Sequence, residues 1–298
     1  HNWHPMAFNP DLGLAYIPAQ EIPGPYVQDL AKASAGGTWN TGIDFAADSP
    51  LNAPPPLITA IKSSLKGRLI AWDPVAQEPR WSVEHPNAWN GGILSAGGLV
   101  FQGQLDGSFS AYDAATGELK WEADLKSGGA SGPGTYEIEG EQYVTITTGW
   151  GSAYALAVGL AYDEKVPPVL GKVVTFKLGG TEQIAASTIP LRPASPQTEP
   201  FGDLALINAG REDFARNCRV CHGYLAESSG VLPDLRWSAY TADAEAWNAV
   251  ILQGTLAGNG MVSFSEQLDV EASEAIRAYV VHRAYETTGP DAAETGGD

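Results

Sequence analysis

Apolar and polar residues alternate in short runs over the first 178 positions, which is the pattern of half-buried β-strands. Clusters of Gly, Pro, Asn and Asp separate the runs, as is typical of turns. The alternation predicts strands at residues 12–18, 68–73, 99–104, 108–113, 142–148 and 153–158. We therefore expect an all-β domain over residues 1–178.

A repeat lies within this β region. The segment Ala71–Asp73 (Ala-Trp-Asp) is followed by Trp81, and Ala111–Asp113 (Ala-Tyr-Asp), forty residues later, is followed by Trp121. A β repeat of this length with a recurring aromatic residue is typical of propeller blades. We expect the aspartate to start a tight turn and the tryptophan to pack between neighbouring blades. Two unrelated β-turns are the alternative reading.

The hydrophobic period changes towards the C-terminus. Residues 179–203 are rich in proline and poor in apolar residues, which predicts an extended linker. Helical spacing then predicts helices at 204–217, 242–252 and 270–284, with a buried set of Leu204, Ile207, Phe214, Ala246, Trp247, Val250, Ile251, Ile276, Tyr279 and Val280. The pattern indicates an all-α domain at 204–287, followed by a disordered tail at 288–298.

Cys218, Cys221 and His222 form a Cys-x-x-Cys-His motif at the end of the first predicted helix. This is the attachment pattern of haem c, in which two thiols add to the haem vinyl groups and the histidine binds the iron. A redox dithiol or half of a zinc site are the alternatives. A zinc site needs two more ligands, and the chain has no other cysteine.

A second axial ligand must come from elsewhere in the chain. Met261 follows Gly258-Asn259-Gly260 in a loop between two predicted helices, and His282 is the alternative ligand. A Met/His pair raises the reduction potential and favours electron transfer. Pro233 lies shortly after the motif, and we expect its carbonyl to accept the proton of the other His222 ring nitrogen.

Composition narrows the choice of partners. The chain of 298 residues has 35 Asp and Glu against 17 Lys and Arg, a formal net charge of −18, which disfavours nucleic acid and anionic lipid. The longest apolar run has ten residues (153–162), too few to span a membrane. The first residues, 1–5, have no initiator methionine and none of the features of a signal peptide, so we expect the natural product to extend upstream.

Several segments together resemble the quinohaemoprotein alcohol dehydrogenases. Residues 2–10, 13–18, 89–103, 140–144, 149–151 and 260–264 carry the likeness, which covers nearly the whole chain. The resemblance implies the C-terminal blades of an eight-bladed propeller that binds pyrroloquinoline quinone (PQQ), followed by a class I cytochrome c domain. Two positions depart from the family pattern. The segment 95–97 is one residue shorter, and Val262 replaces the usual proline after the axial methionine.

The resemblance also implies roles for particular residues. Asn2, Trp3, Trp89 and Asn90 are expected at the PQQ, whereas Trp150 is expected to pack within a blade. The calcium ligands and the catalytic aspartate lie upstream in the family, so no catalytic residue is expected in this chain. We therefore expect the 298 residues alone to bind haem without oxidising alcohols.

The expected function is a part of a periplasmic PQQ-dependent alcohol dehydrogenase. A primary alcohol is the substrate, and haem c relays electrons from reduced PQQ to a soluble periplasmic acceptor. Haem c is attached outside the cytoplasm, which is the reason for this location. One alternative is an electron-transfer protein with a docking β domain and no quinone chemistry. A non-enzymatic propeller fused to a cytochrome is the other.

Overall fold

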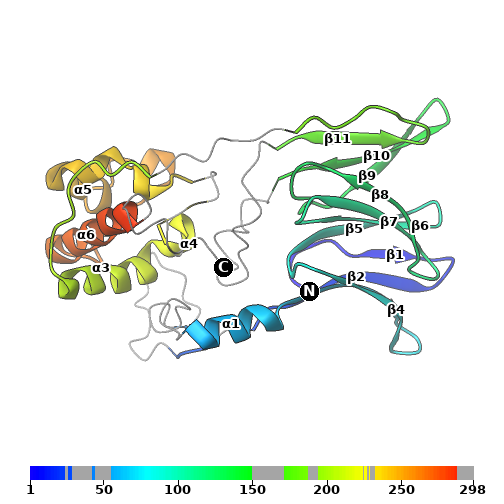
Figure 1. Ribbon diagram of the computed structural model, residues 1–298, viewed down its shortest axis with the longest axis horizontal. Coiled ribbons are helices and arrows are strands. Elements are labelled where there is room, and N and C mark those ends of the chain that lie inside the picture. Colours follow the sequence, from blue (N-terminus) through cyan, green and yellow to red (C-terminus); the bar gives the residue numbers. More distant parts are fainter. Residues whose placement is uncertain are drawn as a thin grey trace. The chain divides into compact units, whose positions relative to one another are not determined.

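The computed structural model describes residues 1–23, 26–28, 42–43, 55–149, 171–186, 194–223, 225–226, 228 and 232–286. The predicted strand at 153–158, Trp150 and the tail at 288–298 lie outside these residues. The described residues fall into two compact units, one made of strands and one made of helices (Figure 1). None of the described helices is both long and apolar enough to cross a membrane.

Three antiparallel sheets make up the β unit. The first contains four strands in chain order: β1 (Ala7–Asn9), β2 (Leu14–Glu21), β3 (Lys66–Asp73) and β4 (Glu78–His85). The second also follows chain order: β5 (Asn90–Ala96), β6 (Leu99–Gln104), β7 (Ser108–Asp113) and β8 (Leu119–Asp124). The third has the order β11-β10-β9 and comprises β9 (Gly134–Ile138), β10 (Glu141–Thr147) and β11 (Val173–Lys177).

The five predicted strands that fall within the described residues are confirmed, with small shifts at some of their ends. Predicted strands 99–104 and 108–113 coincide with β6 and β7, but β2 begins later and ends later than 12–18. The side chain of Asn9 accepts the backbone N–H groups of Asp11 and Leu12, which delays the start of β2. The short hairpin between β5 and β6 closes through Gly97 and Gly98, both at positive φ.

One helix contradicts the all-β prediction for residues 1–178. Helix α1 (Pro55–Ser64) precedes β3 in the β unit. The prolines at its start are compatible with a helix because the first helical N–H groups have no partner inside the helix. The alternation of apolar and polar residues in the neighbouring strands carries no information about this segment. The sequence pattern therefore did not predict the helix.

The repeated Ala-aromatic-Asp segments adopt the same local structure. Oδ1 of Asp73 accepts the backbone N–H groups of residues 75 and 76, both at 2.9 Å. Oδ1 of Asp113 accepts those of residues 115 and 116, both at 3.0 Å. In both sheets the alanine pairs with the tryptophan, and the register shifts at the next residue. The aspartate turn is therefore confirmed.

Each repeat tryptophan also packs against the neighbouring sheet, as predicted. Nε1 of Trp81, in β4, donates to the carbonyl of Ala114 at 3.1 Å in the turn that follows β7. The ring of Trp121, in β8, meets Phe176 of β11 edge-on with centroids 5.0 Å apart. Equivalent turns with equivalent aromatic contacts exclude the reading of two unrelated turns.

The first repeat turn contains a residue in a strained backbone conformation. Replacing this residue with glycine should remove the strain. Gln77 has φ 58°, whereas the equivalent Gly117 has φ 74°. A left-handed conformation costs a non-glycine residue roughly 1–2 kcal/mol, which exceeds the entropic cost of glycine. We expect Gln77→Gly to stabilise the β unit by up to about 1 kcal/mol in denaturant unfolding. The neighbouring residue Ala76 does not have a positive φ, so Ala76→Gly should destabilise the β unit. Stabilisation by both substitutions contradicts the explanation.

Among the residues that the structure describes, the helical unit contains four α-helices and three short 3₁₀ turns. Their bounds are α3 (Leu204–Asn217), α4 (Arg219–His222), η3 (Leu235–Trp237), η4 (Ala239–Ala242), α5 (Ala244–Ile251), η5 (Ala257–Asn259) and α6 (Val270–Glu286). The three predicted helices are confirmed as α3, α5 and α6. Side chains of Asp203 and Asp243 cap the first N–H groups of α3 and α5, which explains why both helices begin there.

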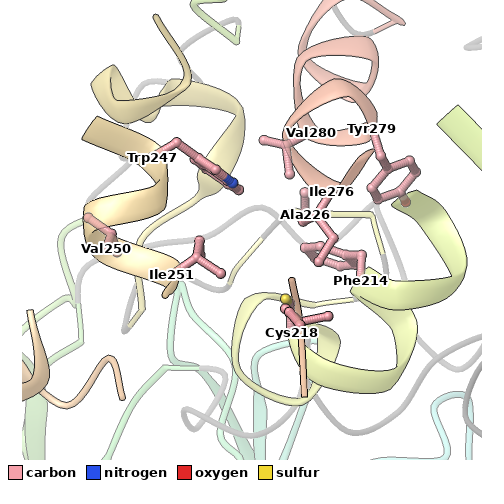
Figure 2. Packing of buried hydrophobic residues seen from close by; sticks show 10 residues of the cluster. Phe214, Cys218, Ala226, Trp247, Val250, Ile251, Ile276, Tyr279 and Val280 are labelled. Atoms are coloured by element: carbon pink, nitrogen blue, oxygen red, sulfur yellow. The ribbon is translucent and has the colours of Figure 1, made fainter. Parts of the chain in front are cut away.

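The core of this unit forms between α3, α5 and α6 (Figure 2). It contains Phe214, Cys218, Ala226, Trp247, Val250, Ile251, Leu268, Ile276, Tyr279 and Val280. One predicted core residue is wrong, because Leu204 is 74% exposed. The buried residues of α3 are Gly210, Phe214 and Ala215, and the first turn of the helix has none.

Candidate functional site

The Cys-x-x-Cys-His motif lies at the junction of α3 and α4. Cys218 ends α3 and precedes α4, and its carbonyl accepts the backbone N–H groups of Cys221 at 3.1 Å and His222 at 3.0 Å. This tight turn places the three residues at positions i, i+3 and i+4, which share one helical face. Cys218 points into the core cluster, whereas Cys221 is exposed (Figure 2).

The imidazole of His222 has a defined orientation. Its Nδ1 lies 3.0 Å from the carbonyl oxygen of Pro233, which confirms the predicted partner. A carbonyl can only accept, so Nδ1 carries a proton and Nε2 keeps its lone pair in the neutral ring. Burial lowers the pKa of His222, which keeps the ring neutral. This arrangement is the one that a histidine ligand of a metal requires.

Met261 lies in a loop that hydrogen bonds tie back to α5. The backbone N–H of Phe264 donates to the carbonyl of Ile251 at 2.8 Å, and Oγ of Ser263 donates to that of Leu252 at 2.6 Å. The Met261 side chain is half-buried against the core cluster that contains Cys218. The loop is thus held in place by the 3₁₀ turn η5 and by these hydrogen bonds.

His282, the alternative ligand, is engaged elsewhere. Its Nε2 lies 3.2 Å from Oε1 of Glu286 one turn further along α6, and its side chain is about a third exposed. An imidazole nitrogen that donates its proton to a carboxylate has no lone pair available to bind iron. The geometry therefore favours Met261 over His282. On the residues described, the motif, the oriented His222 and the Met261 loop fit a haem c.

The two cysteines should differ in reactivity when no haem is attached. Complete burial raises the pKa of Cys218 to about 12, so only roughly one part in ten thousand of this thiol is ionised at pH 8. We expect iodoacetamide to modify exposed Cys221 and to spare Cys218 in the haem-free chain, as read by peptide mass spectrometry. After haem attachment both sulfurs are thioethers, so neither should react. Equal labelling of both thiols in the folded haem-free chain contradicts this burial.

A second group of residues gathers in the β unit. The rings of Trp3 and His4 stack with centroids 5.6 Å apart, and Trp89 meets both edge-on, at 5.4 Å from Trp3 and 5.0 Å from His4. His4 and Trp89 are buried, whereas Trp3 is 58% exposed. The structure therefore brings together two of the four residues expected at the quinone, Trp3 and Trp89. His4 was missed, although its place beside Trp3 was a signal.

Asn90 is the clearest indication of a ligand in this group. It is 3% exposed, and its Nδ2 donates to the carbonyl of Asn87 at 2.8 Å. Its Oδ1 is buried and has no hydrogen-bond partner among the residues that the structure describes. A buried acceptor without a partner is costly, and PQQ has both a ring N–H and carboxyl groups. The residues present fit such a group. Asn2 is exposed.

These features define a class of protein: a β-propeller-type domain followed by a cytochrome c domain. Residues 62–144 match the family model of the glucose/ethanol/alcohol dehydrogenase β-propeller domain. Residues 205–280 match the model of cytochrome c oxidase, cbb3-type, subunit III. Both matches agree with the division between strands and helices.

Relatives extend the match over nearly the whole chain. Quinohemoprotein alcohol dehydrogenase ADH IIB of Pseudomonas putida is 38% identical over 292 residues, which are 96% of this chain and 40% of that protein. The structure of ADHIIG from Pseudomonas putida HK5 superposes with a TM-score of 0.78 at 34% identity, covering 99% of this chain and 43% of that one. The quinohemoprotein alcohol dehydrogenase of Comamonas testosteroni gives 0.68 at 34% identity, covering 95% and 41%.

Over nearly its whole length, the chain is similar in sequence and in fold to the quinohaemoprotein alcohol dehydrogenases. It spans about 40% of the length of the curated relatives that it matches.

Proposed function

We propose that this chain is the C-terminal part of a periplasmic PQQ-dependent alcohol dehydrogenase and relays electrons through a haem c. The observation that carries the proposal is the presence, in one chain, of an oriented CxxCH histidine and of a buried asparagine acceptor that directly follows Trp89, whose ring meets those of Trp3 and His4 edge-on. In this proposal residues 1–178 are the last blades of an eight-bladed propeller. Residues 179–203 are a linker, 204–287 a class I cytochrome c domain, and 288–298 a tail.

The helical unit supplies every residue needed to hold a haem c. Cys218 and Cys221 would form the two thioethers to a haem, and Nε2 of His222 and the sulfur of Met261 would bind its iron. A haem held by these residues would supply single-electron transfer. The Pro233 carbonyl holds the His222 ring in place, and the core cluster excludes water from the Cys218 side.

The β unit supplies part of a quinone pocket. Asn2, Trp3, Trp89 and Asn90 are the residues that we assign to it. A bound PQQ would supply the chemistry for two-electron oxidation of an alcohol, with calcium as Lewis acid. The indole faces of Trp3 and Trp89 provide an apolar wall, and Oδ1 of Asn90 accepts a hydrogen bond from the ligand. The calcium ligands and the catalytic aspartate would be residues outside this chain, as the family resemblance implies.

A soluble periplasmic protein is the proposed electron acceptor, and a primary alcohol the substrate of the complete enzyme. The formal charge of −18 favours an acceptor with a cationic or neutral contact surface. The second candidate function is an electron carrier whose β domain only docks it to a partner. The unpartnered Oδ1 of Asn90 argues against it, because a docking domain has no use for a buried acceptor.

Two measurements on the chain, exported to the periplasm, test the proposal. Haem staining on a denaturing gel should show one covalent haem, located by mass spectrometry on the peptide with Cys218 and Cys221. PQQ should quench the tryptophan fluorescence of the chain joined to its upstream sequence, and quench it less in Asn90→Ala. Haem without any effect of PQQ supports the electron carrier; ethanol oxidation by the 298 residues alone contradicts the division of roles.

A further inference from the structure

Strand β5 carries an irregularity next to the proposed quinone residues. Asn90 pairs with Gln104 and Ile93 pairs with Gln102, so Gly91 and Gly92 together face only Gly103. This is a bulge, which takes backbone groups out of the sheet ladder. Glycine is required at both positions. A Cβ on Gly91 would lie 2.4 Å from the carbonyl oxygen of residue 129, and one on Gly92 would lie 2.3 Å from the Pro5 ring.

A buried side chain donates to the carbonyl of Gly91. Nε2 of Gln102 donates to this oxygen at 2.9 Å, and Gln102 is completely buried, with 0% exposure. The carbonyl only accepts, which fixes the orientation of the amide and turns its Oε1 towards His85. Nε2 of His85 lies 2.9 Å from that Oε1 and must donate to it. His85 therefore fixes the amide that holds the bulge.

The bulge also connects β5 to the N-terminal segment. The N–H of Ile93 donates to the carbonyl of Pro5 at 2.8 Å. The ring of Pro5 sits against Gly92 and Gly132, where an added Cβ would lie 2.3 Å and 2.8 Å from it. Pro5 directly follows Trp3 and His4, whose rings contact Trp89. Two segments more than eighty residues apart thus meet at the bulge.

We propose that His85 and Gln102 are positioning residues that lock the β5 bulge and thereby dock the segment of Trp3 and His4 against Trp89 and Asn90. The proposal rests on the proposed function for its significance, because these segments carry the residues assigned to the quinone. Neither His85 nor Gln102 belongs to that set, and neither contributes to the aromatic wall. Their hydrogen bonds instead determine the position of the segments that carry Trp3 and Trp89.

Gln104 provides a matched control for Gln102. It lies two residues further along β6, on the same face, and it is also buried. Its Nε2 contacts Oγ of Ser110 at 3.1 Å and the Tyr112 hydroxyl at 3.4 Å, within its own sheet and away from Gly91. Methionine has nearly the same shape as glutamine and no comparable hydrogen bonds, so Gln102→Met and Gln104→Met remove equivalent groups.

Amide hydrogen exchange at Ile93 in the quinone-free chain reports the lock directly. Leaving the Gly91 carbonyl without a partner should speed this exchange roughly ten- to hundredfold in Gln102→Met, and Gln104→Met should change it less than threefold. His85→Phe should act like Gln102→Met. His85→Gln places an amide N–H near the position of Nε2 and should restore slow exchange. If Gln102→Met does not fold, the comparison of His85→Phe with His85→Gln tests the proposal.

The same variants, joined to the upstream sequence, should bind PQQ at least fivefold more weakly in Gln102→Met and His85→Phe than in His85→Gln. The proposal that His85 and Gln102 hold the bulge is overturned by either of two results. One is equal Ile93 exchange in Gln102→Met and Gln104→Met, and the other is equal exchange in His85→Phe and His85→Gln. If Ile93 exchange is fast but the affinity for PQQ is unaltered, the bulge does not position the residues assigned to PQQ. Absence of PQQ binding in the unaltered protein, with the exchange pattern intact, contradicts the proposed function and leaves the lock supported.

Discussion

Gly210→Ala is expected to destabilise the helical unit by about 3 kcal/mol or more. Gly210 is buried in α3 where it crosses α6. An added Cβ would lie 1.9 Å from the carbonyl oxygen of Ala275, 2.3 Å from its carbon and 2.9 Å from the backbone nitrogen of Ile276. All three atoms belong to the backbone of a helix with a buried face, so no side-chain rotation relieves the clash. The two helices must separate, and their separation opens the core around Phe214.

Thermal and denaturant unfolding followed by circular dichroism measure this loss. Gly258→Ala is the matched control, because no atom lies within 4 Å of its added Cβ and its φ is not positive. We expect the control to unfold like the unaltered chain. Since Cys218 closes α3, Gly210→Ala should also reduce covalent haem incorporation in exported protein. Equal stability of the two variants is incompatible with the close helix crossing.

Met261→His is expected to lower the reduction potential of the haem more than any other single change outside the CxxCH motif. A thioether stabilises the reduced iron relative to a second imidazole, and axial ligands set haem potentials over a range of roughly 0.8 V. Hydrogen bonds from the loop to α5 keep position 261 against the core, so the new imidazole is presented where the thioether was. Potentiometric titration gives the potential.

Met261→Ala separates ligand loss from ligand exchange. It removes the sixth ligand, so the reduced protein should bind carbon monoxide, which neither the unaltered protein nor Met261→His should do. Val262→Ala is the control, because Val262 is next in the chain and half-exposed and carries no ligand atom. A potential that is unchanged in Met261→His would falsify Met261 as the ligand, and the same measurement on His282→Ala would then test the alternative.

Local patterns were sufficient for much of the fold. Three helices were predicted from apolar spacing, and the aspartate turns of the repeat followed from residues three or fewer positions apart. The packing of Trp81 and Trp121 against the next sheet was predicted because a repeat implies equivalent surroundings. Helix α1 was missed, since its ten residues interrupt a region in which alternation dominates. Leu204 was misplaced because helical spacing does not reveal where a partner helix ends.

The two candidate sites differ in how far sequence analysis could lead. At the haem site, the predicted Pro233 carbonyl partner of His222 is confirmed, because the two residues are close in the chain, whereas the thioethers and the iron ligands stay predictions. The quinone residues came from family resemblance. Nothing in their spacing predicts that His4 stacks on Trp3, or that Oδ1 of Asn90 is buried without a partner.

The sequence by itself determined the covalent chemistry of this protein. Two thiols and an imidazole within five residues occupy one helical face whatever surrounds them, because helical geometry is local. Tertiary structure alone decided the ring contacts of Trp3, His4 and Trp89 and the bulge in β5. The bulge at Gly91 and Gly92 depends on a cross-strand register, on the buried Gln102–His85 pair and on Pro5, which are distant in the chain. Register and burial arise only when strands meet, so no local pattern encodes them.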